Sequence, residues 1–144
     1  MRRLGLDLGE RRIGIAVSDP LGITAQGISV YERKGSRKQE VEFFQNLIHT
    51  YEVKEVILGL PKNMNGSEGP AAEKARSFGE WLTKQFGITV VYWDERLSTS
   101  SAQQVMIEAD VSRRNRKGKI DQLAATIILQ NYLDFKCKQV QRVD

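Results

Sequence analysis

The stretch that decides the fold is "LGLDLGERRIGIAVSD", residues Leu4 to Asp19. Residues 12–18 alternate apolar with small or polar side chains, a period of two that predicts a β-strand. Gly9 and its charged neighbours separate this strand from an earlier one over residues 3–8, which predicts a tight hairpin. Asp7 lies inside the first strand, where a charged side chain is costly to bury without a partner. The sequence therefore raises the question of what Asp7 is paired with.

The rest of the chain alternates between helical and extended patterns. Apolar residues recur at helical spacing in several segments, and β-branched or aromatic runs separate those segments. Strands are predicted over 23–31, 55–60 and 88–95, and helices over 38–51, 70–86, from about 98 to 109, and over 120–135. Three strands followed by helix–strand crossovers predict an α/β fold with a mixed sheet and helices on both faces. In such sheets, functional sites gather at strand ends near the middle of the sheet.

Composition limits the class of protein. The chain has 144 residues, so a single domain over 1–144 is expected. Lys and Arg exceed Asp and Glu by only four, so nucleic-acid binding must rest on where the cations lie. A lone cysteine cannot form an internal disulfide, and neither a signal peptide nor a membrane span is predicted. These features favour a cytoplasmic protein without a membrane partner.

Carboxylates occur where a structural pattern alone would not place them. Asp7 interrupts the first strand, Asp94 and Glu95 end the last strand, and Asp121 opens the last predicted helix. If these positions converge, the carboxylates repel one another unless a cation joins them. Mg²⁺ and Mn²⁺ prefer oxygen ligands, and two such ions about 3.5–4 Å apart can assist phosphodiester hydrolysis. With one Cys and one His in the chain, the sequence does not favour a zinc site.

Four motifs in this order resemble the YqgF (RuvX) family of RNase H-like nucleases. They are "LDLGERRIGIAVSD", "ILGLPKNMNGSEGP", "DERLSTSSA" and "KGKIDQLAATIILQNYL", and the resemblance runs from about Leu4 to Leu133. It implies an RNase H-like, five-stranded mixed sheet whose first three strands are antiparallel, which agrees with the strands predicted above. It also implies a metal-dependent nuclease acting either on the 16S ribosomal RNA precursor or, as a Holliday junction resolvase, on branched DNA.

The resemblance carries an acidic triad over to Asp7, Glu95 and Asp121 as catalytic metal ligands for Mg²⁺ or Mn²⁺, with two ions expected. Strand alternation puts Asp94 and Glu95 on opposite faces, and the family pattern favours Glu95. Read singly, each acid also has a structural explanation. Asp7 could bond the hairpin amides around Gly9, Asp121 could favour the positive end of its helix, and Asp94 could cap the following loop.

Several cations and polar residues are expected to contact nucleic acid. They are Arg113, Arg114, Arg116, Lys117 and Lys119 in the basic run before Asp121, Lys62 and Asn63 in the loop after the fourth strand, and Arg96 and Thr99 beside Glu95. The alternatives are a solvated basic loop, an ordinary strand-to-helix loop, and a helix cap at Thr99. Trp81 and Trp93 are expected in the core.

Two other functions fit parts of the sequence. An actin-like or Hsp70-like ATPase also has a "DLG" after its first strand, but it needs two related halves and a second glycine-rich phosphate motif. A catalytically weak nucleic-acid-binding module would not need carboxylates facing phosphates. Within the nuclease class, a junction resolvase should be a two-fold homodimer because it cuts two strands symmetrically, whereas an enzyme that trims ribosomal RNA can act as a monomer.

Overall fold

The protein is built on one five-stranded sheet with strand order β3-β2-β1-β4-β5. The computed structural model describes residues 2–97 and 117–143, with the side chains of 97, 117–121 and 140–143 left aside. The strands are β1 (Arg2–Leu8), β2 (Arg12–Ser18), β3 (Ala25–Glu32), β4 (Val53–Leu60) and β5 (Thr89–Asp94). β1, β2 and β3 pair antiparallel, whereas β4 pairs parallel with both β1 and β5. The predicted mixed sheet with three antiparallel strands first is confirmed.

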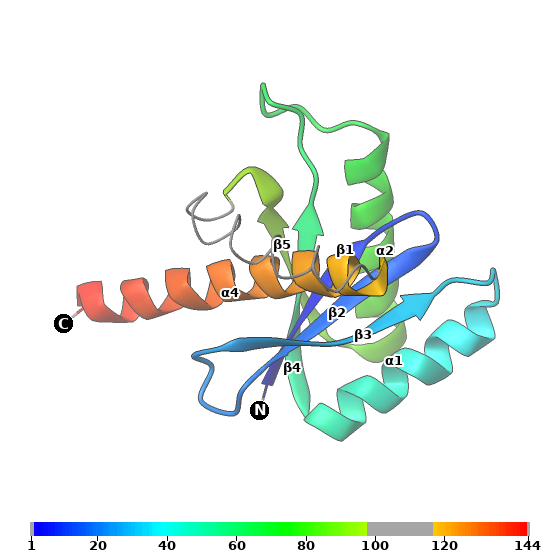
Figure 1. The fold of residues 1–144 in the computed structure, drawn as a ribbon, viewed down its shortest axis with the longest axis horizontal. Coiled ribbons are helices and arrows are strands. Elements are labelled where there is room, and N and C mark those ends of the chain that lie inside the picture. Colours follow the sequence, from blue (N-terminus) through cyan, green and yellow to red (C-terminus); the bar gives the residue numbers. More distant parts are fainter. Residues whose placement is uncertain (1, 98–116, 144) are drawn as a thin grey trace.

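Helices cover both faces of this sheet, as predicted (Figure 1). Helices α1 (Arg37–Tyr51) and α2 (Pro70–Phe86) pack on one face around a core that includes Leu6, Phe44 and Leu58. Helix α4 (Lys117–Val143) packs on the other face, against Ala16 and Ile57. Alternation along each strand therefore sends successive side chains to two separate hydrophobic cores.

Local sequence signals explain where the helices begin and end. The Ser36 side chain accepts a hydrogen bond from the backbone N–H of Gln39 and caps the start of α1. Gly87 ends α2 in the left-handed conformation, which confirms the glycine cap that the sequence predicts. Trp81 and Trp93 pack against the two cores, as expected.

The last helix is longer than its sequence pattern predicts. It begins at Lys117 rather than near residue 120 and continues to Val143 rather than to 135, so Asp121 does not open the helix. The extra turns are rich in Lys, Gln and Arg, which favour helix without adding to the apolar pattern. The predicted helix from 98 to 109 lies outside the described residues, and none of the helices that are described could span a membrane.

Candidate active site

The candidate site lies at the edge of the sheet where β1, β4 and β5 end. β4 pairs with β1 on one side and with β5 on the other, so the ends of β1 and β5 are separated by one strand. Asp7 is the second-to-last residue of β1, and Glu95 follows β5 as the first residue of the short 3₁₀ turn η1 (Glu95–Leu97). Residues far apart in the sequence thus meet because parallel strands end at the same edge.

Asp7 and Glu95 lie on the same face of the sheet, joined by a hydrogen bond between their side chains. This is the face that α4 covers, since Gly5, two residues before Asp7, lies against Leu129 of α4. The structure also bears on the alternative role of Asp7 in the hairpin. The Gly9 N–H donates to the Arg12 carbonyl at 2.8 Å and closes the hairpin.

Gly59 of β4 provides the space in which the two carboxyl groups meet. A Cβ atom at this position would lie 2.6 Å from Oε1 of Glu95 and 2.6 Å from Cδ1 of Ile128. Both distances are shorter than van der Waals contact, so any side chain would push Glu95 or α4 away. The missing side chain of the intervening strand is therefore what lets Glu95 reach toward Asp7.

The pair is electrostatically strained when no cation joins it. Partial burial, the nearby charge of Asp7 and the hydrogen bond to Asp7 together raise the pKa of Glu95 to about 7. Two carboxyl groups this close share a proton near neutral pH rather than both ionising. A divalent cation relieves this strain by replacing the proton, and carboxylate oxygens are the donors that Mg²⁺ and Mn²⁺ prefer.

This strain gives a prediction for stability without metal. The pKa of Glu95 is about 7 in the folded state, whereas the ordinary pKa of the group is 4.5. Between pH 4.5 and pH 7 the folded state therefore binds more protons than the unfolded state. The free energy of unfolding therefore falls as the pH rises through this range. In EDTA at about pH 8, we expect Glu95→Gln to be more stable than wild type by roughly 1–2 kcal/mol, a value reduced for solvent screening.

At about pH 4 the two proteins should melt at similar temperatures, because a neutral glutamic acid and a glutamine can both donate to Asp7. Thermal melts in EDTA across this pH range measure the difference directly. Melting curves that stay parallel at every pH would contradict the strained pair.

Asp94 faces away from the pair and is neutralised by Arg96. Arg96 donates from its backbone N–H to Oδ1 of Asp94 at 2.9 Å, and from Nη2 to Oδ2 at 2.7 Å. These bonds lower the pKa of Asp94, in contrast to the raised pKa of its neighbour Glu95. Asp94 caps the turn that carries Glu95, which agrees with its alternative role as a capping residue.

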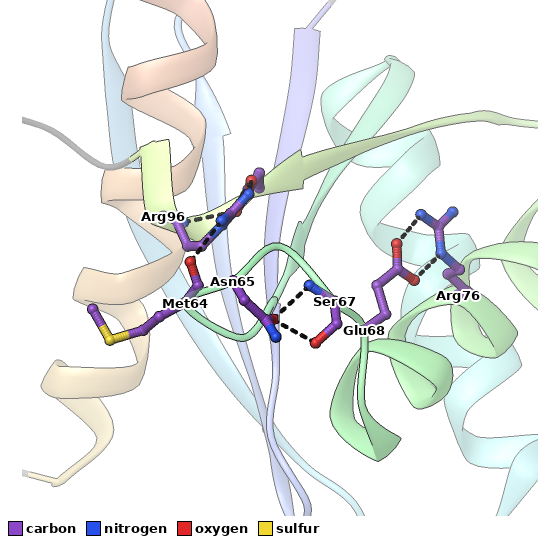
Figure 2. Close-up of polar contacts among 7 residues, drawn as sticks. Met64, Asn65, Ser67, Glu68, Arg76 and Arg96 are labelled. Atoms are coloured by element: carbon purple, nitrogen blue, oxygen red, sulfur yellow. Dashed lines mark hydrogen bonds and ion pairs between the residues drawn. The ribbon is translucent and has the colours of Figure 1, made fainter.

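The loop after β4 is tied to this turn through Arg96. Nη1 of Arg96 donates to the backbone carbonyl of Met64 at 3.3 Å (Figure 2). Within the loop, the Asn63 side chain donates to Oγ of Ser67 at 2.9 Å, and Gly66 adopts a positive φ of 89°. Lys62 lies close enough to lower the pKa of Asp94. Lys62, Asn63 and Arg96 are thus brought to the same end of the sheet as Glu95.

The remaining predicted site residues lie partly or wholly outside the described part of the chain. Thr99, Arg113, Arg114 and Arg116 fall in the undescribed segment, and only the backbones of Lys117, Lys119 and Asp121 are described, in the first turns of α4. Asp121 stands one turn before Ala125, which packs on the sheet. Among the described side chains no three metal-binding residues form a group, so the described part of the acidic site is a pair.

Sequence reasoning missed the roles of two residues. The first is Gly59, whose neighbours across the sheet face are Glu95 and Ile128. The ion pair between Asp94 and Arg96 was also missed, although the two residues flank Glu95 directly. The signal for Gly59 was a glycine inside the apolar run VILGL at the end of the fourth strand.

Comparisons with known proteins agree with this architecture. A family model described as "RuvX: Holliday junction resolvase" matches residues 1–135. Relatives named "Putative pre-16S rRNA nuclease" include one from Halothermothrix orenii, 56% identical over 96% of this chain and 98% of its own. Another, from Listeria innocua, is 52% identical over 93% of this chain and 98% of its own.

Solved structures of resolvases share the fold. The chain resembles Thermus thermophilus RuvC with a TM-score of 0.59 at 13% identity, over 96% of this chain and 97% of that one. It also resembles the fowlpox virus resolvase in complex with Holliday junction DNA. The TM-score is 0.57 at 14% identity, over 94% of this chain and 99% of that one. The family model and the relatives together show that this chain belongs to the RuvX (YqgF) family, as its sequence motifs predict.

Proposed function

We propose that the protein is a metal-dependent nuclease that hydrolyses phosphodiester bonds in structured nucleic acid, most specifically in maturation of the 16S ribosomal RNA precursor. The observation that carries the proposal is the Asp7–Glu95 pair, held across Gly59 at the parallel edge of the sheet. A carboxyl pair under this electrostatic strain marks a functional site more often than a structural one. The names of the close relatives supply the substrate class.

In this proposal Asp7, Glu95 and Asp121 hold Mg²⁺ or Mn²⁺. When bound, two such ions stabilise the attacking and leaving oxygens of phosphodiester hydrolysis. Glu95 would hold the ion as a deprotonated carboxylate, so metal binding should strengthen as the pH rises toward and past about 7. Phosphates beside the cleaved bond are then contacted by the basic run and by polar residues near Glu95. These residues are Arg113, Arg114, Arg116, Lys117 and Lys119 in the basic run, with Lys62, Asn63 and Thr99.

A second candidate substrate is a four-way DNA junction. The family model carries the description of a Holliday junction resolvase, and the fold is that of resolvases, one of them in complex with junction DNA. This activity requires symmetric cleavage of two strands and hence a homodimer. For either substrate a cytoplasmic location remains part of the proposal.

The deciding experiment compares two labelled substrates under the same conditions. A fragment of precursor 16S RNA and a four-way DNA junction are incubated with the protein in Mg²⁺, in Mn²⁺ and in EDTA. We expect metal-dependent cleavage of the RNA fragment in preference to the junction. Preferential junction cleavage would select the resolvase activity, whereas binding without cleavage in either metal would leave a nucleic-acid-binding module.

Arg96 offers a test of how the site is held. Its side chain is engaged by Asp94 and Met64, so we assign it a positioning role in addition to its predicted contact with nucleic acid. Arg96→Lys keeps the charge but cannot reproduce the forked bonds to Asp94. We expect kcat to fall about tenfold with KM within about twofold of wild type, because misplacing Glu95 affects the chemical step. An unchanged kcat with a raised KM would instead make Arg96 a phosphate contact only.

A further inference from the structure

A second surface near the candidate site has the chemistry of a nucleic-acid contact. A groove of about 1150 Å³ opens between the start of α1, the start of α2 and the β1–β2 turn, which we call the α1–α2 groove. Its polar lining is formed by Gly9, Glu10, Arg33, Arg37, Glu73 and Lys74. These segments lie beside one another at the end of the sheet where β1 finishes (Figure 1).

The α1–α2 groove adjoins the candidate active site at the end of β1. Leu8 and Gly9 line it, and they follow Asp7 directly in the chain. The two residues from Asp7 to Gly9 span about 7 Å of extended chain, so the end of β1 alone separates the groove from the carboxyl pair. Asp7 faces α4, whereas Leu8 packs into the core beneath α1 and α2. A ligand that leaves the site over this edge would therefore enter the groove.

Cations are concentrated around the groove. Residues 9–12 and 32–38, which comprise the two connections and the strand and helix residues that flank them, hold six Lys or Arg residues and two Glu residues. The backbone N–H of Arg33 donates to the carbonyl of Arg11 at 2.7 Å, which joins the two connections.

Two of the arginines are held in place by aromatic rings. The guanidinium of Arg37 lies 4.5 Å from the ring centre of Trp81, and that of Arg33 lies 5.5 Å from that of Phe78. A stacked guanidinium loses little further freedom on binding, and its edge can still donate to a phosphate. Arg33 also forms an ion pair with the buried Glu40 at 3.2 Å, so Arg37 and Lys74 are the lining cations left to meet a phosphate, beside the carboxylates of Glu10 and Glu73.

We infer that the α1–α2 groove binds backbone phosphates of the nucleic acid that flanks the cleaved bond, an inference that rests on the proposed nuclease function. Exposed cations along a groove attract the phosphate backbone without reading sequence. The groove thus extends the contact surface to the face of the sheet opposite α4. It also guides the strand over the β1–β2 turn.

The test uses the double variant Arg37→Gln/Lys74→Gln. Arg33 is left unchanged because its loss would strand the buried Glu40. The matched control is Arg2→Gln/Lys54→Gln, which removes the same charge at the opposite edge of the sheet, where Arg2 stacks on Tyr51 at 5.6 Å as Arg37 does on Trp81. Binding of a fluorescent stem-loop RNA with single-stranded flanks is measured against salt in EDTA, and melting temperatures verify folding.

We expect the groove variant to bind roughly tenfold more weakly at about 0.1 M salt, with a salt slope reduced by about 1.4–1.8 for two lost phosphate contacts. The control variant should bind as wild type does. If wild type binds and cleaves but the groove variant keeps its slope, or if both variants lose slope equally, the groove assignment is overturned and the nuclease function stands. If wild type neither binds nor cleaves, the proposed function and the groove fall together.

Discussion

Asp7→Asn should lose at least about a thousandfold of the metal-dependent cleavage, while the metal-free fold stays at least as stable as wild type. The substitution keeps the shape of the side chain but removes one charge from the pair with Glu95, whose pKa is raised by that charge. Loss of a ligand abolishes metal binding, whereas loss of the repulsion favours the folded state. This opposition between activity and stability is typical of active sites.

The matched control is Asp19→Asn, the same change at an acid with a structural role. Asp19 accepts hydrogen bonds from the backbone N–H groups of Ile23 and Thr24 at 2.7 and 2.9 Å, so its replacement should lower the melting temperature and spare cleavage. Cleavage assays and melts in EDTA on both variants decide the matter. A clearly destabilised Asp7→Asn would mean that Asp7 holds the hairpin and is not a metal ligand.

Gly59→Ala should lower cleavage about a hundredfold although no polar group is changed. Its Cβ would lie 2.6 Å from Oε1 of Glu95, so the carboxyl group must move by the order of 1 Å, and misplacement on that scale costs about 10²-fold in rate. The contact with Ile128 adds overpacking, which typically costs about 1–3 kcal/mol of stability. Activity is therefore expressed per folded molecule.

Gly5→Ala separates the two effects. A Cβ at Gly5 would lie 2.7 Å from Cβ of Leu129, so the same helix is overpacked on the same face without displacing Glu95. Its stability should fall by a similar amount, with most of the cleavage retained. Equal loss of activity in both variants would show that the position of α4, rather than that of Glu95, controls the rate.

Alternation along the strands accounts for most of what the sequence could predict. A period of two places Asp7 with Gly5 on one face and puts Asp94 and Glu95 on opposite faces, whereas the choice of Glu95 as the partner of Asp7 came from the family resemblance. The strand order was also accessible, because hairpins pair neighbours and crossovers add parallel strands. The true start of α4 was not accessible, since its first turn lacks an apolar pattern.

Contacts between elements that are distant in the chain could not be predicted from the sequence pattern. Nothing in the spacing of Arg37 or Lys74 indicates that they line one groove, because that depends on how α1 and α2 pack on the sheet. Likewise, the use of Gly59 as space for Glu95 depends on the register Gly59↔Trp93 between β4 and β5. Local sequence constrains elements, whereas such sites arise from the packing of elements far apart in the chain.

The position of α4 at the end of the chain has a consequence for synthesis. All five strands are complete once Asp94 has been added, yet the face that carries Ala16 and Ile57 stays uncovered until α4 has been made. At 5–20 residues per second, the ribosome needs several seconds for the segment from Asp94 to Val143. During that interval the nascent chain exposes an apolar sheet face, which invites chaperone binding or aggregation.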